Sequence, residues 1–203
     1  MDPRFANPEA LPWQERAIVA AAVESRRREF AAGRMLARRL LQSLGFEGPL
    51  NRTRDGTPAW PPGIVGSISH CATLAAAAVC RSGNCAGLGI DVDIRQPLSS
   101  EIAMRILTSD EAYWTASCEA NADAGILVFC AKEAFYKAIY PLTRQVIEFN
   151  SVNITPAGKG FSAELLINVG PFRRGDVLPG RWNTSQSHVA AAVAIDRAML
   201  AEF

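Results

Sequence analysis

Residues 87–94 read GLGIDVDI, and this stretch decides the fold. Within it, residues 88–93 alternate in character, which is the period-2 pattern of a β-strand with one buried face. On such a strand Asp91 and Asp93 share a face, and we expect Ile90 and Val92 to point into the core. Two neighbouring carboxylates repel unless a cation lies between them. They suit Mg²⁺, which typically takes one or two carboxylates and fills its other positions with water and phosphate oxygens. A solvated strand end is the alternative.

A second short strand is expected upstream, where residues 66–70 read GSISH. The preceding segment, residues 51–66, is rich in glycine and proline and is predicted to be a loop. Ser69 and His70 end this strand with small donors that suit a phosphate. His70 could equally be a core histidine whose nitrogens are satisfied by protein groups.

The remaining elements mix helices with hairpin-like strands, which predicts an α+β fold. A helix is expected over residues 14–44, with a possible break near Ser25 that would start a second helix at the arginines, and a stop at Gly45. Thr108 or Ser109 should cap a helix that runs to residue 117, and another should span residues 126–140 and end at Pro141. Strands are expected at residues 147–154, 161–169 and 188–195. The segments SISH (67–70) and SQSH (185–188) are each followed by an alanine-rich run, so two related halves or chance similarity are both open.

Composition places the chain among ordinary globular proteins and excludes several classes. Its 203 residues are enough for one good core or two small ones, and 49% of them are apolar. A net charge of +1 gives no general case for nucleic-acid binding. The longest apolar run, residues 17–23, is much shorter than the roughly 20 residues that span a bilayer. Five cysteines without CxxC spacing and two histidines indicate neither a disulfide framework nor a zinc site, so we expect a cytoplasmic protein.

Two basic or mixed-charge segments are candidates for phosphate binding. Residues 26–39 hold six arginines against one glutamate, and Arg26 and Arg34 lie there, with Arg52 in the following loop. Arginine forks match phosphate oxygens, but a solvated face or a dock for an acidic protein would also explain them. In the helix at 126–140, Glu133 lies one turn from Lys137, which is compatible with a metal and phosphate site or with an ordinary ion pair.

Four motifs taken in order resemble the 4′-phosphopantetheinyl transferase superfamily, in its larger single-chain branch that serves siderophore, non-ribosomal peptide and polyketide synthases. They are RRREFAAGR (26–34), RDGTPAWPPGIVGSISHC (54–71), GLGIDVDI (87–94) and FCAKEAFYKAIYPL (129–142). The resemblance implies two pseudo-symmetric halves, residues 1–97 and 98–203, each a small antiparallel sheet packed with a helix, with the active site in the cleft between them. It implies transfer of the 4′-phosphopantetheine group of coenzyme A to a serine of an apo acyl or peptidyl carrier protein, with adenosine 3′,5′-bisphosphate as the second product.

The resemblance also assigns site residues. It implies Mg²⁺ ligation by Asp91, Asp93 and Glu133, and catalytic roles for Glu133, Lys132 and Asp91, with Glu133 as the base. The residues implied to bind coenzyme A are Arg26, Arg34, Arg52, Ser69, His70, Asp91, Lys132 and Lys137. Many family members have glutamate in place of Asp93 and tryptophan in place of Phe129, and the shorter aspartate could reach a metal through water.

Two other functions fit the same residues. A Mg²⁺-dependent phosphohydrolase of nucleotide pyrophosphates would use the same carboxylates and arginines. A non-catalytic module could use the arginines to dock a carrier protein. We expect a monomer whose partners are coenzyme A and carrier proteins, with no nucleic acid and no membrane.

Overall fold

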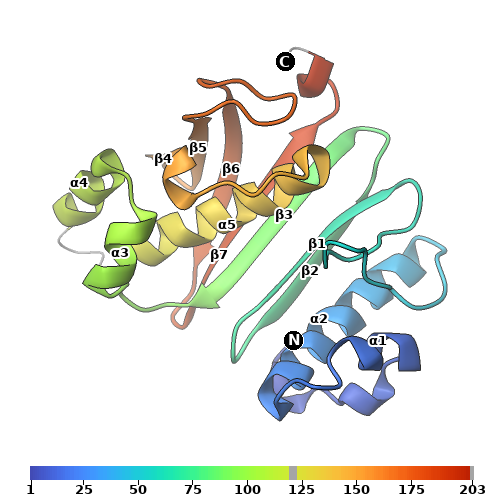
Figure 1. Cartoon of the computed structure of the whole chain (residues 1–203). Helices are drawn as coiled ribbons and strands as arrows, with labels where there is room; N and C mark the ends of the chain where they lie inside the picture. Colours follow the sequence, from blue (N-terminus) through green and yellow to red (C-terminus); the bar gives the residue numbers. More distant parts are fainter. Residues whose placement is uncertain (119–122, 202–203) are drawn as a thin grey trace.

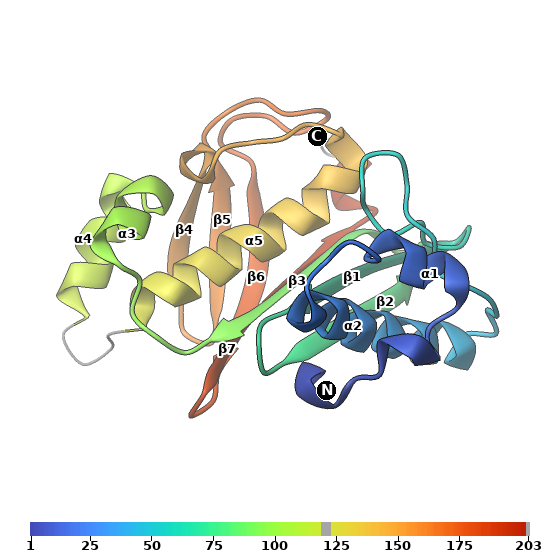
Figure 2. The ribbon, with the colours of Figure 1, turned by 60° about the horizontal axis from the view of Figure 1, so that its bottom comes forward.

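The computed structural model describes residues 1–118 and 123–201 and has an α+β fold, as predicted. Its strands form two antiparallel sheets, one of two strands and one of five. A long helix packs against each sheet: α2 (Glu24–Ser43) on the smaller and α5 (Ala124–Thr143) on the larger (Figure 1). Figure 2 shows both helices lying across their sheets, with the two sheets side by side.

The smaller sheet pairs β1 (Ile64–His70) with β2 (Ala75–Arg81). The predicted strand at 66–70 is therefore confirmed, whereas β2 was not predicted, because its alanine-rich sequence lacks an alternating pattern. Side chains of α2, β1 and the loop before β1 form the core of this half, including Leu41, Leu50 and Ile64.

The single helix predicted over residues 14–44 is in fact two helices. The first is α1 (Trp13–Ile18), preceded by two 3-10 turns (Pro3–Phe5 and Pro8–Ala10), and the second is α2. The break falls at residues 19–23, so the second helix begins next to Ser25, as the sequence allowed, with Val23 rather than Ser25 as its N-cap. It turns α1 back so that the buried Glu15 accepts a hydrogen bond from the Leu50 N–H at 3.1 Å. This contact ties α1 to the loop that precedes β1.

The larger sheet has the strand order β3-β7-β6-β5-β4, and neighbouring strands are antiparallel. The strand expected at 188–195 is confirmed, and those expected at 147–154 and 161–169 are present but begin or end elsewhere. β6 was not predicted, because it contains proline and glycine, which are rare in strands. The bounds are β3 (Cys85–Ile94), β4 (Val152–Ala157), β5 (Gly160–Leu165), β6 (Val177–Thr184) and β7 (His188–Asp196), with a 3-10 turn (Phe149–Ser151) before β4 and another (Met199–Ala201) after β7.

Two short helices connect β3 to α5. α3 (Ser100–Ile106) was not predicted, whereas α4 (Ser109–Ser117) begins where the sequence indicated. The Thr108 hydroxyl accepts from the Glu111 N–H, and the Glu111 carboxylate accepts from the Thr108 N–H, which is a complete capping box. Helix α5 continues past Pro141 to Thr143, so the predicted end is two residues early. Arg144 then leaves the helix with a left-handed backbone, at φ 54°.

The GLG segment of β3 is required by how closely α5 approaches it. A Cβ atom on Gly89 would lie 1.8 Å from the Ala134 carbonyl oxygen, and one on Gly87 would lie 2.4 Å from the Ala138 carbonyl oxygen. Asp91 is paired with Ala191, whose side chain belongs to the core under α5. The carboxylate face of β3 is therefore the face that α5 covers. Val92 is buried as predicted, but on the opposite face, where Ile90 is only half-buried.

The two sheets are joined by side chains rather than by a backbone ladder. The Ser67 hydroxyl accepts from the Ile90 N–H at 3.0 Å, and the Ser69 hydroxyl accepts from the Val92 N–H at 3.2 Å. β3 therefore pairs with β7 on one edge and meets β1 through serine hydroxyls on the other. The division at residue 97 stays a prediction. Within the described residues, no helix is both long and apolar enough to cross a membrane.

Candidate active site

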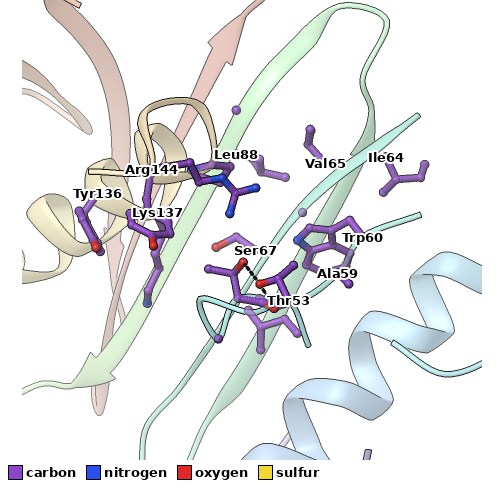
Figure 3. A pocket seen from close by; sticks show the side chains of 18 of the residues that line it. Thr53, Ala59, Trp60, Ile64, Val65, Ser67, Leu88, Tyr136, Lys137 and Arg144 are labelled. Carbon is purple, nitrogen blue, oxygen red and sulfur yellow. Dashed lines mark hydrogen bonds between the residues drawn. The ribbon is translucent and has the colours of Figure 1, made fainter. Parts of the chain in front are cut away.

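Two neighbouring cavities lie on either side of β1 and the loop that precedes it. The Lys137 cavity, of about 570 Å³, lies between β1, the start of β3 and the end of α5 (Figure 3). The arginine cavity, of about 430 Å³, lies between α1, α2 and β1 and is lined by Arg26, Arg34, Arg52 and His70. Gly56, Pro58 and Ile68 line both cavities. The fold therefore brings together the predicted phosphate-binding residues from three separate sequence motifs.

Lys137 stands between two of the predicted carboxylates. Its Nζ atom lies 2.6 Å from Oδ1 of Asp91 and 3.9 Å from Oε2 of Glu133. The same nitrogen is 3.3 Å from the Ser69 hydroxyl, which donates to Asp91 at 2.6 Å. Polar side chains from β1, β3 and α5 thus lie together in one cluster, although the sequence predicted them in separate motifs.

The electrostatics of this cluster favour a bound cation. Burial raises the pKa of Glu133 above its ordinary value, Lys137 opposes that rise, and the charge of Asp91 adds to it. Burial likewise raises the pKa of Asp93, and Asp91 again adds to the effect. Burial is the larger cause of each raised pKa, and repulsion from the Asp91 carboxylate adds to it. Additional positive charge would relieve this repulsion.

The donor set fits Mg²⁺ with an incomplete protein shell. Among residues 1–118 and 123–201, no group of three His, Cys, Asp or Glu side chains is arranged to hold a metal ion. Asp93 already accepts a hydrogen bond from the Ile94 N–H at 2.7 Å. Mg²⁺ commonly takes one or two carboxylates and keeps waters and phosphate oxygens for the rest, and Asp91 with Glu133 meets that requirement.

In the arginine cavity the predicted residues differ in how many of their hydrogen-bond donors are available to an anion. Arg26 Nη1 lies 2.8 Å from His70 Nε2, and burial, then the charge of Arg26, lowers the pKa of His70. Arg52 donates to the Gly56 carbonyl at 2.7 Å and is exposed. Arg26 and Arg52 can turn further donors toward an anion, whereas Nδ1 of His70 lies 3.3 Å from the Glu29 carboxylate.

Arg34, which the resemblance implied to bind coenzyme A, makes its hydrogen bonds to backbone carbonyls of the protein. It is 4% exposed, and its guanidinium donates to the carbonyls of Leu50 and Asn51. It also lies 4.8 Å from the centre of the Phe30 ring, and burial lowers its pKa to about 10. Arg34 therefore fixes the start of the loop that carries Arg52.

Lys132 does not lie where the resemblance implied. Its side chain is 1% exposed, and Nζ is 2.7 Å from the Glu111 carboxylate. The same nitrogen donates to the carbonyls of Ile106 at 2.7 Å and Phe149 at 2.9 Å. An ammonium group has three protons to donate, so all are used inside the protein. The predicted phosphate contact and catalytic role of Lys132 are therefore corrected to an internal ion pair that joins α5 to α3 and α4.

Three residues in or beside the Lys137 cavity were not among the predicted site residues: Asp55, Trp60 and Arg144. Asp55 accepts from the Arg144 guanidinium at 2.5 Å and from the Tyr140 hydroxyl at 3.2 Å. Trp60 lines the opposite wall, where Gly66 leaves room for its ring. Asp55 stands in a predicted turn and Arg144 follows a predicted helix end, but nothing in the sequence pairs two residues so far apart.

Comparison with known proteins gives matches along most of the chain. A family model described as "4'-phosphopantetheinyl transferase N-terminal domain" matches residues 14–80, and one described as "4'-phosphopantetheinyl transferase superfamily" matches residues 87–195. 4'-phosphopantetheinyl transferase Svp of Streptomyces mobaraensis is 38% identical, over 90% of this chain and 77% of that protein. 4'-phosphopantetheinyl transferase PptT of Mycobacterium tuberculosis is 32% identical, over 94% of this chain and 89% of that protein. Enterobactin synthase component D of Salmonella typhimurium is 35% identical, over 71% and 60%.

Proposed function

Because the chain belongs to the 4′-phosphopantetheinyl transferase superfamily, we propose that the two cavities together form its coenzyme A site. The chain is an enzyme of the type that serves siderophore, non-ribosomal peptide and polyketide synthases, and it transfers 4′-phosphopantetheine from coenzyme A to a serine of a carrier protein. The assignment of individual residues is our proposal. The observation that carries it is the convergence of Asp91, Glu133 and Lys137 beside a cavity lined by arginines.

The two ends of the coenzyme would bind to different parts of the cleft. The pyrophosphate is placed beside Lys137 and Ser69, whose donors lie 3.3 Å apart at the junction of β1 and α5. The 3′-phosphate is placed in the arginine cavity, against Arg26, Arg52 and His70. The shared walls of the two cavities support a single continuous ligand rather than two separate ones.

Mg²⁺ is proposed to be held by Asp91 and Glu133, with Asp93 acting through water. The ion would neutralise charge on the pyrophosphate, as metal ions commonly do in phosphoryl-type transfer. In its absence Lys137 is the cation between these carboxylates, since its Nζ lies within 3.9 Å of both. We infer that Lys137 turns toward the phosphates when the coenzyme binds.

In the proposed reaction, one side chain takes the proton of the carrier serine and another stabilises the leaving group. The carrier serine oxygen attacks the β-phosphorus of coenzyme A, and the bond to the leaving adenosine 3′,5′-bisphosphate breaks. Glu133 is proposed as the base that takes the serine proton, because its carboxylate lies beside Lys137, where the pyrophosphate is proposed to bind. Lys137 is positioned to stabilise negative charge on the departing phosphate.

Compartment, oligomeric state and domain division also remain proposals. All five cysteines are free thiols, which supports a reducing compartment such as the cytoplasm. We propose a division of the chain near residue 97, with β3 of the first part pairing with β7 of the second. We propose that the enzyme acts as a monomer, without nucleic acid or membrane.

One experiment tests the proposed function as a whole. The protein is incubated with coenzyme A, Mg²⁺ and a panel of apo-carrier domains, and mass spectrometry measures addition of the phosphopantetheine arm. We expect addition to at least one carrier and release of adenosine 3′,5′-bisphosphate. Free phosphopantetheine formed without a carrier would instead identify a phosphohydrolase. Carrier binding that is insensitive to both coenzyme A and Mg²⁺ would identify a docking module.

A further inference from the structure

A loop of the N-terminal half is tied across the cleft to the end of α5. This loop, residues 52–58, lines both cavities through Gly56 and Pro58. Oδ2 of Asp55 accepts from the Arg144 guanidinium at 2.5 Å and from the Tyr140 hydroxyl at 3.2 Å. Within the described part of the chain, these are the only hydrogen bonds found between the loop and α5. The loop therefore depends on Asp55 for its hold on the other half.

The loop is built so that Asp55 and Arg52 cannot move independently. Thr53 and Thr57 both donate hydroxyl hydrogen bonds to Asp55 Oδ1, and the Thr53 N–H donates to the Thr57 carbonyl at 2.8 Å. These bonds, led by the one from Thr53, hold the pKa of Asp55 well below its usual range. Gly56 has φ +92°, and a Cβ there would meet the Arg52 guanidinium at 2.7 Å. A shift of Asp55 would therefore displace Arg52.

On the other side of the cleft, the end of α5 directs Arg144 toward the loop. Arg144 has a left-handed backbone, which is uncommon for a residue other than glycine. Its guanidinium carbon lies 6.0 Å from the centre of the Tyr140 ring. Figure 3 shows the side chain extending from α5 over the Lys137 cavity. The turn that ends the helix therefore brings this cation to the mouth of the cleft.

We propose that Asp55 and Arg144 are positioning residues that hold the loop 52–58 closed over the cleft and thereby set the affinity for coenzyme A. This inference rests on the proposed function of the cleft. Asp55 and Arg144 are 30% and 55% exposed as side chains, so the pair contributes little to global stability. Its effect is on how often the loop occupies the position that places Arg52 against the coenzyme. A ligand that binds only the closed loop loses apparent affinity in proportion to the closed fraction.

The test uses Asp55→Asn, Arg144→Met and the double variant of the full chain. Each single variant should raise the KM and the Kd for coenzyme A by roughly fivefold, with kcat and the melting temperature close to wild type. The double variant should be no weaker than the single ones, because both changes open the same contact. Glu101→Gln is the matched control, since it removes an exposed ion pair with Arg105 on α3.

Limited proteolysis reports on the loop without using activity. Trypsin cleaves after arginine, and Arg52 and Arg54 lie in the loop. Cleavage at these residues should be faster in the three variants than in wild type or the control, and coenzyme A should slow it in all of them.

The outcomes separate this inference from the proposed function. Unchanged cleavage and unchanged coenzyme A affinity in the variants would overturn the positioning role. Weaker coenzyme A binding in Arg144→Met but not in Asp55→Asn would also overturn it, because Arg144 would then contact the coenzyme directly. Wild-type protein that binds no coenzyme A would overturn the proposed function itself.

Discussion

At the scale of single residues, the site shows one cation shared among several carboxylates. Lys137 contacts Asp91 and approaches Glu133. Its positive charge stabilises these two carboxylates before any metal binds. Asp93 differs from the other two, because its Oδ1 accepts a hydrogen bond from the Ile94 N–H. The three carboxylates therefore should not contribute equally to activity.

We predict that Asp91→Asn and Glu133→Gln each lower kcat by at least roughly a hundredfold, the loss expected when a main electrostatic contribution is removed. Asp93→Asn should lower kcat by a smaller factor. The measurement is transfer of a fluorescent phosphopantetheine arm to an apo-carrier domain at saturating Mg²⁺. Near-normal rates for both Asp91→Asn and Glu133→Gln would contradict the metal assignment.

At the scale of elements, α5 is fixed by contacts that act through its backbone and through a buried charge. The helix lies so close to β3 that glycines are required at two positions of the strand, and Lys132 joins it to α3 and α4. Glu133 stands next to Lys132 on the same helix. The placement of a reactive carboxylate therefore depends on elements that do not line the cavity.

Gly89→Ala should destabilise the protein by about 1–3 kcal/mol or more, because the added Cβ would overlap the backbone of α5. The added Cβ would lie only 1.8 Å from the Ala134 carbonyl oxygen. Because that atom belongs to the backbone, moving a side chain could not relieve the overlap. Gly83→Ala is a matched control, since a Cβ there meets nothing within 4 Å. Denaturant unfolding of the two variants provides the comparison, and equal stabilities would contradict the packing described.

Lys132→Met should lower the free energy of unfolding by about 3–5 kcal/mol, because it leaves the buried Glu111 charge without its partner. Lys132→Met with Glu111→Leu should recover part of that loss. The exposed Lys159 gives a control, as Lys159→Met should leave the melting temperature unchanged. If Lys132→Met kept wild-type stability and only weakened coenzyme A binding, the phosphate contact implied by the resemblance would be right after all.

At the scale of the whole molecule, the proposed site lies where the two sheets meet. β1 contributes Ser69 and His70, β3 contributes Asp91, and α5 contributes Lys137, while the loop at 52–58 closes over them. A ligand that fills this junction should therefore stabilise both halves together.

Coenzyme A at a hundred times its Kd should stabilise the native state by about 2.7 kcal/mol, which corresponds to a rise of roughly 5–10 °C in the melting temperature. Dephospho-coenzyme A should give a smaller rise at equal concentration. Arg26→Gln should narrow the difference between the two ligands, because Arg26 is proposed to meet the 3′-phosphate. A thermal shift series tests this, and an unchanged difference would place the 3′-phosphate elsewhere.

Local sequence determined the elements whose signals are local. The alternation in GLGIDVDI identified β3, Thr108 with Glu111 identified the start of α4, and the 3.6-residue pattern identified α5. It failed where a local signal was absent or misleading, as in the alanine-rich β2 and in α5, which continues through Pro141. In those places packing against a neighbour outweighs intrinsic preference.

The sequence by itself determined which residue types serve the site: adjacent carboxylates on a strand, a Lys and Glu pair on a helix, and clustered arginines. Only the tertiary structure decided which of them face the cleft. It buried Lys132 against Glu111, turned Arg34 to the carbonyls of its own half and brought Arg144 to Asp55. The physical reason is that helical and strand periodicity fix a face relative to the element's own axis, whereas the partner of that face depends on contacts between residues far apart in the chain.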